Sequence, residues 1–109
     1  MSRKGVVYCK GNRAGRIEET TSGYLFAYDT HYLASSSSPA ISLTLPKRTE
    51  PFRSPVLFPF FFGLLAEGAL KETQCRQLRI DENDHFGRLL KTTHSDTIGD
   101  VTVVEEVET

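Results

Sequence analysis

Histidine and cysteine are the side chains of this sequence best suited to acid–base, nucleophilic or metal chemistry, and they are few and scattered. The histidines are His31, His85 and His94, and the cysteines are Cys9 and Cys75. No Cys-x-x-Cys pair or zinc-type spacing occurs, so we expect no metal and two reduced thiols. The alternatives are a metal held by His31 or His85 with Cys75, or a bridge between the cysteines, and both depend on geometry.

Motifs that bind phosphate or activate a nucleophile are missing. The sequence contains no G-x-x-x-x-G-K-[ST], no G-x-G-x-x-G and no G-x-S-x-G. His94, Ser95 and Asp96 have the residue types of a catalytic triad, but neighbours in one loop seldom converge. We therefore expect an ordinary turn there, no catalytic residue, no cofactor, no small-molecule substrate and no enzyme activity.

Basic side chains are concentrated in the first half of the chain. Residues 1–53 carry eight Lys or Arg against four Asp or Glu, and residues 54–109 carry five against ten. This asymmetry has two possible interpretations. It steers a partner electrostatically, or it is only a solvated surface with unevenly distributed charges. The basic residues of the first half are Arg3, Lys4, Lys10, Arg13, Arg16, Lys47, Arg48 and Arg53. Because no recognition helix or stacking platform accompanies them, direct nucleic-acid binding is the weakest hypothesis.

The serine run at residues 35–38 is a possible phosphorylation site, although such runs are usually plain loops. The N-terminus has no long apolar region of the signal-peptide type, and residues 56–66 are too few to span a bilayer. We expect a cytoplasmic protein that does not associate with membranes.

The elements that must position these residues begin with short strands. Residues 5–10, 14–19 and 24–28 predict an antiparallel meander, with hairpin turn chemistry at Gly11-Asn12. Strict alternation over residues 41–45 predicts a half-buried strand, and residues 101–107 predict a closing strand.

Helix signals dominate the second half. Asp29 is a candidate N-cap for one helical turn, and Ser54-Pro55 is a good helix entry, although Pro59 favours a tight turn before a helix over residues 59–66. Further helices are expected at 69–79 and, capped by Asp84, at 86–91, followed by a loop over 92–99. The sum is an α+β fold: a small curved antiparallel sheet or partial barrel with two to three short helices packed on it.

Residues 54–68 are the stretch around which these elements are organised. Four of the seven phenylalanines fall within residues 58–62, and no polar side chain occurs between Pro55 and Glu67. A helix that is apolar all round is buried in the core or covered by a partner.

Several of these segments carry a family pattern. They are F-A-Y-D-T-H-Y-L-A (residues 26–34), P-A-I-S-L-T-L-P (39–46), F-P-F-F-F-G-L-L-A-E-G (58–68), F-G-R-L-L (86–90) and S-D-T-I-G-D-V-T-V (95–103). With them the chain resembles the N-terminal domain of HipA-type toxin kinases, over residues 1–109 as a single domain. Relatives commonly have proline where Ala66 stands, a bulkier residue where Ala69 stands and alanine where Asp100 stands.

The resemblance implies a role through a partner. Because no kinase lobes follow the domain before Thr109, we expect a stand-alone, HipS-like antitoxin of a split system, which binds and inhibits a separate HipA-like Ser/Thr kinase. The expected contact residues are Glu67, Gly68, Ala69, Leu70, Lys71 and Glu72, whereas Phe58, Phe60, Phe61, Leu64 and Leu65 are expected in the core. Because Ala69 is small, a large side chain plugging the kinase site is not implied.

Two alternatives stay open. One is a structural subunit that completes the kinase without neutralising it, and the other is a DNA-binding component of the complex. The resemblance also leaves room for a separate DNA-binding third component.

Overall fold

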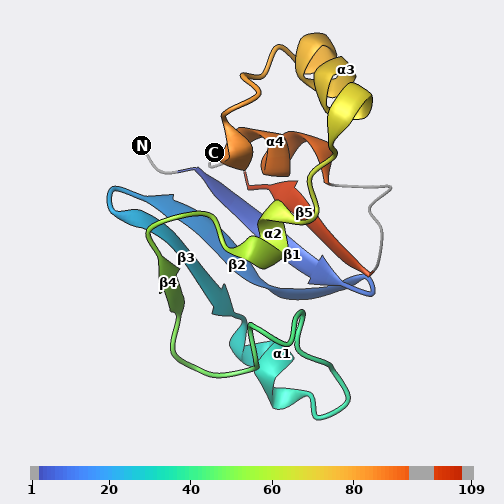
Figure 1. The fold of residues 1–109 in the computed structure, drawn as a ribbon. Helices are drawn as coiled ribbons and strands as arrows, with labels where there is room; N and C mark the ends of the chain where they lie inside the picture. Colours follow the sequence, from blue (N-terminus) through green and yellow to red (C-terminus); the bar gives the residue numbers. More distant parts are fainter. Residues whose placement is uncertain (1–2, 94–99, 107–109) are drawn as a thin grey trace.

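The sheet is the frame of the molecule. In the computed structural model, which describes residues 3–93 and 100–106, five strands form one open antiparallel sheet in the order β4-β3-β2-β1-β5 (Figure 1). The strands are β1 (Lys4–Cys9), β2 (Asn12–Thr20), β3 (Gly23–Tyr28), β4 (Phe52–Ser54) and β5 (Val101–Glu105). The helices are α1 (Thr30–Ala34), α2 (Pro59–Phe62), α3 (Gly68–Leu78) and α4 (His85–Thr92). The predicted α+β fold is confirmed, with an open sheet and four described helices.

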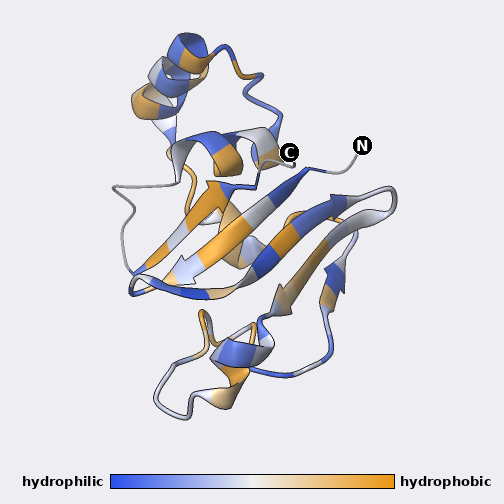
Figure 2. Ribbon diagram, turned by 180° about the vertical axis from the view of Figure 1, so that it is seen from behind, coloured by the Kyte–Doolittle hydropathy of each residue, from blue (hydrophilic) through white to orange (hydrophobic). Residues whose placement is uncertain are grey.

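The helices are not spread evenly over the sheet. Both views place α2 and α4 against the same face, while α3 lies beyond α4 and away from the strands (Figures 1 and 2). The core lies between that face and its cover, and its largest fully buried side chains are Phe26, Phe61, Phe86, Ile17 and Leu89. Burial of this aromatic and aliphatic area is the main favourable term in folding.

The first hairpin turns one residue earlier than the sequence predicted. Lys10 and Gly11 both have left-handed φ values, 52° and 82°, and Asn12 already pairs with Cys9 as part of β2. Two consecutive positive φ values match the right-handed twist of the flanking strands, which is why such turns are favoured in two-residue hairpins.

The strand predicted at residues 41–45 is wrong. Only an isolated bridge between Ser42 and Leu45 is present, in a turn whose ends, Ile41 and Leu45, are buried while Leu43 is fully exposed. The Tyr28 hydroxyl accepts a hydrogen bond from the Ile41 amide (3.1 Å) and donates to the Leu45 carbonyl. The alternation therefore reflects two anchored turn ends, and burial raises the pKa of the Tyr28 hydroxyl.

Both edges of the sheet are interrupted. The short strand β4, which the sequence pattern did not indicate, pairs with β3 and lies between Pro51 and Pro55. At the other edge, the Val103 amide of β5 donates to the Thr93 carbonyl at 2.9 Å, just after α4. One described edge strand is therefore short, and the other has one of its outward amides already bonded.

The helix predictions had mixed outcomes. Asp84 caps α4 as expected, because its carboxylate accepts a hydrogen bond from the Gly87 amide at 3.1 Å. Asp29 precedes α1, but its carboxylate accepts from Arg13 instead of capping the helix. The helix expected over residues 59–66 ends at Phe62, and tighter turns continue to Leu65.

Candidate functional site

The described histidines and cysteines lie on separate elements of the fold. His31 lies exposed on α1, His85 opens α4, and both Cys9 and Cys75 are buried free thiols. Among the described residues no group of three or more His, Cys, Asp or Glu side chains is placed to hold a metal ion. The triad-like residues 94–96 lie outside the described part of the chain.

Most basic side chains of the first half are already engaged within the molecule. Ion pairs join Arg13 to Asp29 (2.8 Å), Arg16 to Glu106 (3.0 Å) and Lys4 to Glu18 (3.6 Å). The Arg48 guanidinium stacks on the Phe52 ring at 3.7 Å. A nucleic acid would have to compete with these contacts for the same cations.

The serine run is held by one of these cations. The Lys47 ammonium donates to the carbonyls of Ser35 (2.7 Å) and Ser38 (2.8 Å) and lies 5.3 Å from the centre of the Tyr32 ring. Lys47 thus closes the loop over α1, which gives this part of the basic segment a structural role.

Arg3 fastens the start of β1 to the start of α4. Its guanidinium bonds both carboxylate oxygens of Glu19 (2.9 and 2.8 Å) and both of Asp84 (2.8 and 3.0 Å). Hydrogen bonding from Arg3 holds the pKa of the Asp84 carboxyl below its ordinary value, and the bonds to Glu19 and Asp84 raise the pKa of Arg3. Asp84, which caps α4, is therefore bound both by the Arg3 guanidinium and by the Gly87 amide.

The phenylalanine run is core, as the sequence predicted. Phe58, Phe61 and Leu65 are buried, and Phe60 and Leu64 pack partly buried against the same cluster. The Phe61 ring contacts those of Phe26, Phe58 and Phe60, with centroids 5.2 to 6.2 Å apart. The exception in the run is Phe62, which is 47% exposed and packs edge-on against His85.

A second region, residues 68–83, contributes no side chain to the contiguous core cluster. We call this region the arm. It consists of α3 and the loop that follows, and Figure 1 shows it beyond α4, away from the sheet. Polar and apolar residues are mixed around the helix (Figure 2), and its one buried side chain, Cys75, is not part of the contiguous core cluster. Leu70 and Leu78 are 59% and 50% exposed.

The predicted contact residues lie where the chain enters the arm. Glu67, Gly68, Ala69, Leu70 and Glu72 are exposed, and Lys71 is half-buried. Gly68 has φ +62° with open space where a Cβ would stand, so backbone conformation and not crowding favours glycine there. The structure brings the six residues onto one projecting segment, and their role in binding stays a prediction.

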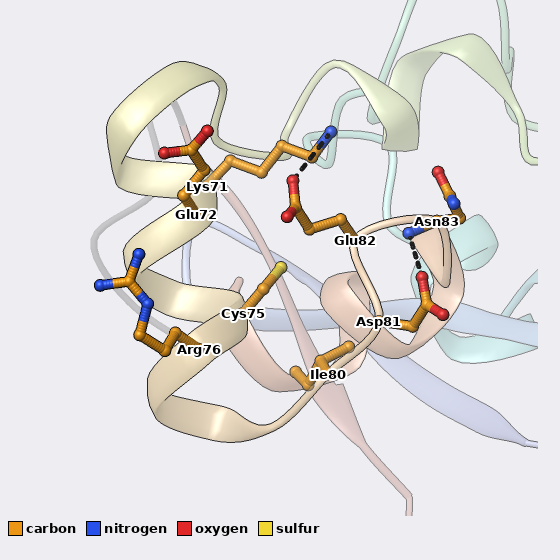
Figure 3. A pocket seen from close by; sticks show the side chains of 8 residues that line it. All are labelled: Lys71, Glu72, Cys75, Arg76, Ile80, Asp81, Glu82 and Asn83. Atoms are coloured by element: carbon orange, nitrogen blue, oxygen red, sulfur yellow. Dashed lines mark hydrogen bonds and ion pairs between the residues drawn. The ribbon is translucent and has the colours of Figure 1, made fainter.

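The arm folds back on itself around a hollow of 790 Å³ (Figure 3). One wall is the face of α3 with Lys71, Cys75 and Arg76, and the other is the return loop from Ile80 to Asn83. Lys71 reaches toward Glu82 across the hollow at 3.9 Å, and the Asp81 carboxylate accepts from the Asn83 amide at 2.8 Å. These contacts are internal to the arm.

One residue that the sequence analysis missed joins the arm to the body. Arg88 of α4 is only 3% exposed, and its guanidinium donates to the Ala66 carbonyl at 2.6 Å. The available signal was an arginine inside the apolar face of F-G-R-L-L, where a buried cation requires a partner. Within the part of the chain that the structure describes, no helix has the length and apolar character needed to cross a membrane.

Comparisons with known proteins agree over nearly the whole chain. A family model described as the HipA N-terminal domain matches residues 6–104. A solved structure described as the N-terminal domain of HipA toxin superposes with a TM-score of 0.73 at 33% identity, covering 98% of this chain and 95% of that one.

Two sequence relatives differ in length. An uncharacterized protein of Haemophilus influenzae is 36% identical over 106 residues, which are 97% of this chain and 95% of that protein. A protein of Sinorhizobium fredii named "Putative kinase Y4mE" is 30% identical over 101 residues. The match covers 92% of this chain but only 24% of the Sinorhizobium protein, so the chain spans about a quarter of that relative.

Proposed function

Because the chain belongs to the HipA N-terminal domain family, we propose that it is a non-catalytic regulatory subunit, an antitoxin, that binds a separate HipA-like Ser/Thr kinase and holds it inactive. In this proposal residues 1–109 act as one domain in the cytoplasm. The partner is recognised through protein surface alone, without a cofactor or a small-molecule substrate.

The observation that carries the proposal is the projecting entry of the arm. Leu70 and Leu78 are exposed on α3, which contributes no side chain to the contiguous core. Exposed apolar side chains on an element that stabilises the fold little are typical of a protein-binding segment. The Sinorhizobium relative, in which a matching segment is a quarter of a protein named as a kinase, supports a kinase as the partner.

Inhibition requires more than binding. The subunit must bind the inactive state of the kinase more tightly than the active state, or block its substrate or nucleotide cleft. Suppression of activity by roughly 100-fold corresponds to about 3 kcal/mol of differential affinity. The contact residues in this proposal are Glu67, Gly68, Ala69, Leu70, Lys71 and Glu72.

A second function is favoured by the same relative. If the domain is an integral part of a kinase, a separate copy can complete the kinase fold without neutralising it. Direct DNA binding by this chain has less support, because most of the basic side chains that would serve it are paired internally. DNA binding in the complex would then come from a third component.

Co-expression with the cognate HipA-like kinase tests the proposal. We expect the kinase to be toxic alone and harmless with this chain, and a pull-down to recover the two together. Toxicity that persists while the two proteins bind would favour the completing subunit, and the absence of any complex would reject both functions. A kinase variant without activity serves as the control for expression.

A further inference from the structure

Arg88 is a buried cation without a buried anion. It lies on α4 with 3% of its surface exposed, and among residues 3–93 and 100–106 no carboxylate forms an ion pair with it. A guanidinium is costly to remove from water, so burial on a helix that could carry leucine or methionine needs a compensating contact. That contact is the hydrogen bond to the Ala66 carbonyl at 2.6 Å, which is charge-assisted and therefore strong.

The bonded carbonyl occupies a special place in the chain. The turn hydrogen bonds that continue α2 end with the Leu65 amide, and α3 begins at Gly68. Ala66 thus lies in the short connection between two helices. Arg88 fixes this connection one residue before Glu67, where the proposed contact segment starts.

The other end of the arm is fastened to the same helix. Asp84, where the return loop ends, caps α4 and is bound by Arg3. The Arg88 amide also donates to the Asp84 carbonyl at 3.0 Å. Entry and exit of the arm are therefore both set by contacts to the first turns of α4, one through Arg88 and the other through Arg3.

Between these two points the arm has little else to hold it in place. Its side chains contribute nothing to the contiguous core, and its ion pair, Lys71 with Glu82, joins two parts of the arm itself. An isolated helix of eleven residues is marginal in water. Its placement therefore depends on its packing against α4 and on the points where the arm joins the body.

We propose that Arg88 is a positioning residue, whose bond to the Ala66 carbonyl sets the place and direction of residues 67–72 for the kinase. This inference rests on the proposed function of that segment. The arm is then presented in a preset arrangement, which lowers the entropy cost of association compared with a segment that orders on binding. Arg88 itself touches no partner.

The test compares three variants of the full chain. Arg88→Met removes the donor but keeps an apolar side chain of similar length, Arg88→Lys restores a charged N–H donor, and Lys91→Met is a matched control on the exposed side of α4. Hydrogen exchange of the isolated chain is measured at the helical amides of residues 72–78 and in β1 and β2. Affinity for the HipA-like kinase is measured separately.

We expect Arg88→Met to speed exchange in residues 72–78 about tenfold or more, with β1 and β2 unchanged, and to weaken kinase binding about tenfold. Arg88→Lys should recover most of both effects, and Lys91→Met should show neither. Unchanged exchange in folded Arg88→Met, or unchanged kinase affinity, overturns the inference.

Two further outcomes are also decisive. If the wild-type chain binds no HipA-like kinase, the proposed function fails, and the role of Arg88 in presenting a kinase-binding segment fails with it, whatever the exchange data say about the arm. If Arg88→Met does not fold, Arg88→Gln replaces it. Faster arm exchange in Arg88→Gln than in Arg88→Lys then supports the inference, and equal exchange overturns it.

Discussion

The phenylalanine run of α2 and the arm are neighbours in the sequence but have opposite relations to the core. Phe61 is fully buried among aromatic rings, whereas Leu70, nine positions later, is 59% exposed on a helix outside the core cluster. The first segment holds the sheet and its helices together. The second adds little to the core and leaves apolar side chains exposed to solvent. The change occurs within the short connection that Arg88 fixes.

The largest expected effect is a loss of stability from a substitution in the buried phenylalanine run. Phe61→Ala should lower the free energy of unfolding by about 3–5 kcal/mol, because it leaves a cavity among Phe26, Phe58 and Phe60. Urea denaturation followed by circular dichroism measures the loss. Phe62→Ala, in the same helix but 47% exposed, is the matched control and should cost about 1 kcal/mol or less. Similar losses from both would remove the distinction.

The next effect should appear in binding and not in stability. Leu70→Arg should leave the free energy of unfolding within about 0.5 kcal/mol of wild type while weakening kinase binding about tenfold or more. Titration calorimetry and urea denaturation measure the two quantities. Val56→Arg, at a side chain 64% exposed outside the arm, should change neither. Loss of stability in Leu70→Arg would mean that the arm belongs to the folding core.

A smaller effect on stability is expected at Asp84, where the arm ends at α4, and not in the exposed loop before it. The folded-state pKa of Asp84 is lowered by Arg3, so its contribution is present above the ordinary value near 3.8 and is lost as pH falls through the folded pKa. Asp84→Asn keeps a capping side chain but should cost about 1 kcal/mol at neutral pH, a value discounted because both partners are over a third exposed.

The pH dependence provides the check on that prediction. The difference between wild type and Asp84→Asn should shrink as the pH falls below 3.8 and through the lowered folded-state pKa of Asp84, measured by urea denaturation at each pH. Asp81→Asn, which removes a carboxylate from the exposed loop of the arm and leaves the Arg3 pair intact, is the matched control. A constant difference across pH would argue that the ion pair with Arg3 is not its cause.

The smallest effect is expected inside the arm. Lys71→Met removes the 3.9 Å pair with Glu82 and should change the free energy of unfolding by less than about 0.5 kcal/mol. Hydrogen exchange in residues 72–78 should also stay close to wild type. An increase in exchange as large as that expected for Arg88→Met would mean that the pair of Lys71 with Glu82, and not Arg88, holds the arm in place.

The features predicted well from the sequence are those that depend on neighbours along the chain. Asp84 caps α4, and the Phe58–Phe61 region is core, because capping and apolar clustering are local signals. The turn at residues 41–45 was read as a strand because its buried ends are fixed by Tyr28, thirteen or more positions away. Such long-range anchors leave no periodic signal.

The site shows the same division. The contact segment 67–72 was predicted from the family pattern; five of its six residues are exposed, and its role in binding stays a prediction. Arg88 was missed because its partner is a backbone carbonyl, and no residue type in the sequence marks which carbonyl a buried arginine will bind. The exposure of Leu78 was equally hidden, since a leucine at this position of the helix would also suit a packed helix.

The interrupted edges of the sheet bear on how this chain behaves when it is abundant. A sheet with a long free edge offers a template for adding strands from other copies, which leads to aggregates. Here β4 is three residues long between prolines, and β5 gives its Val103 amide to Thr93. Both features shorten the free edge to which a strand of another copy could pair. A chain whose free edges are this short can reach a high concentration with less tendency to aggregate through its strands.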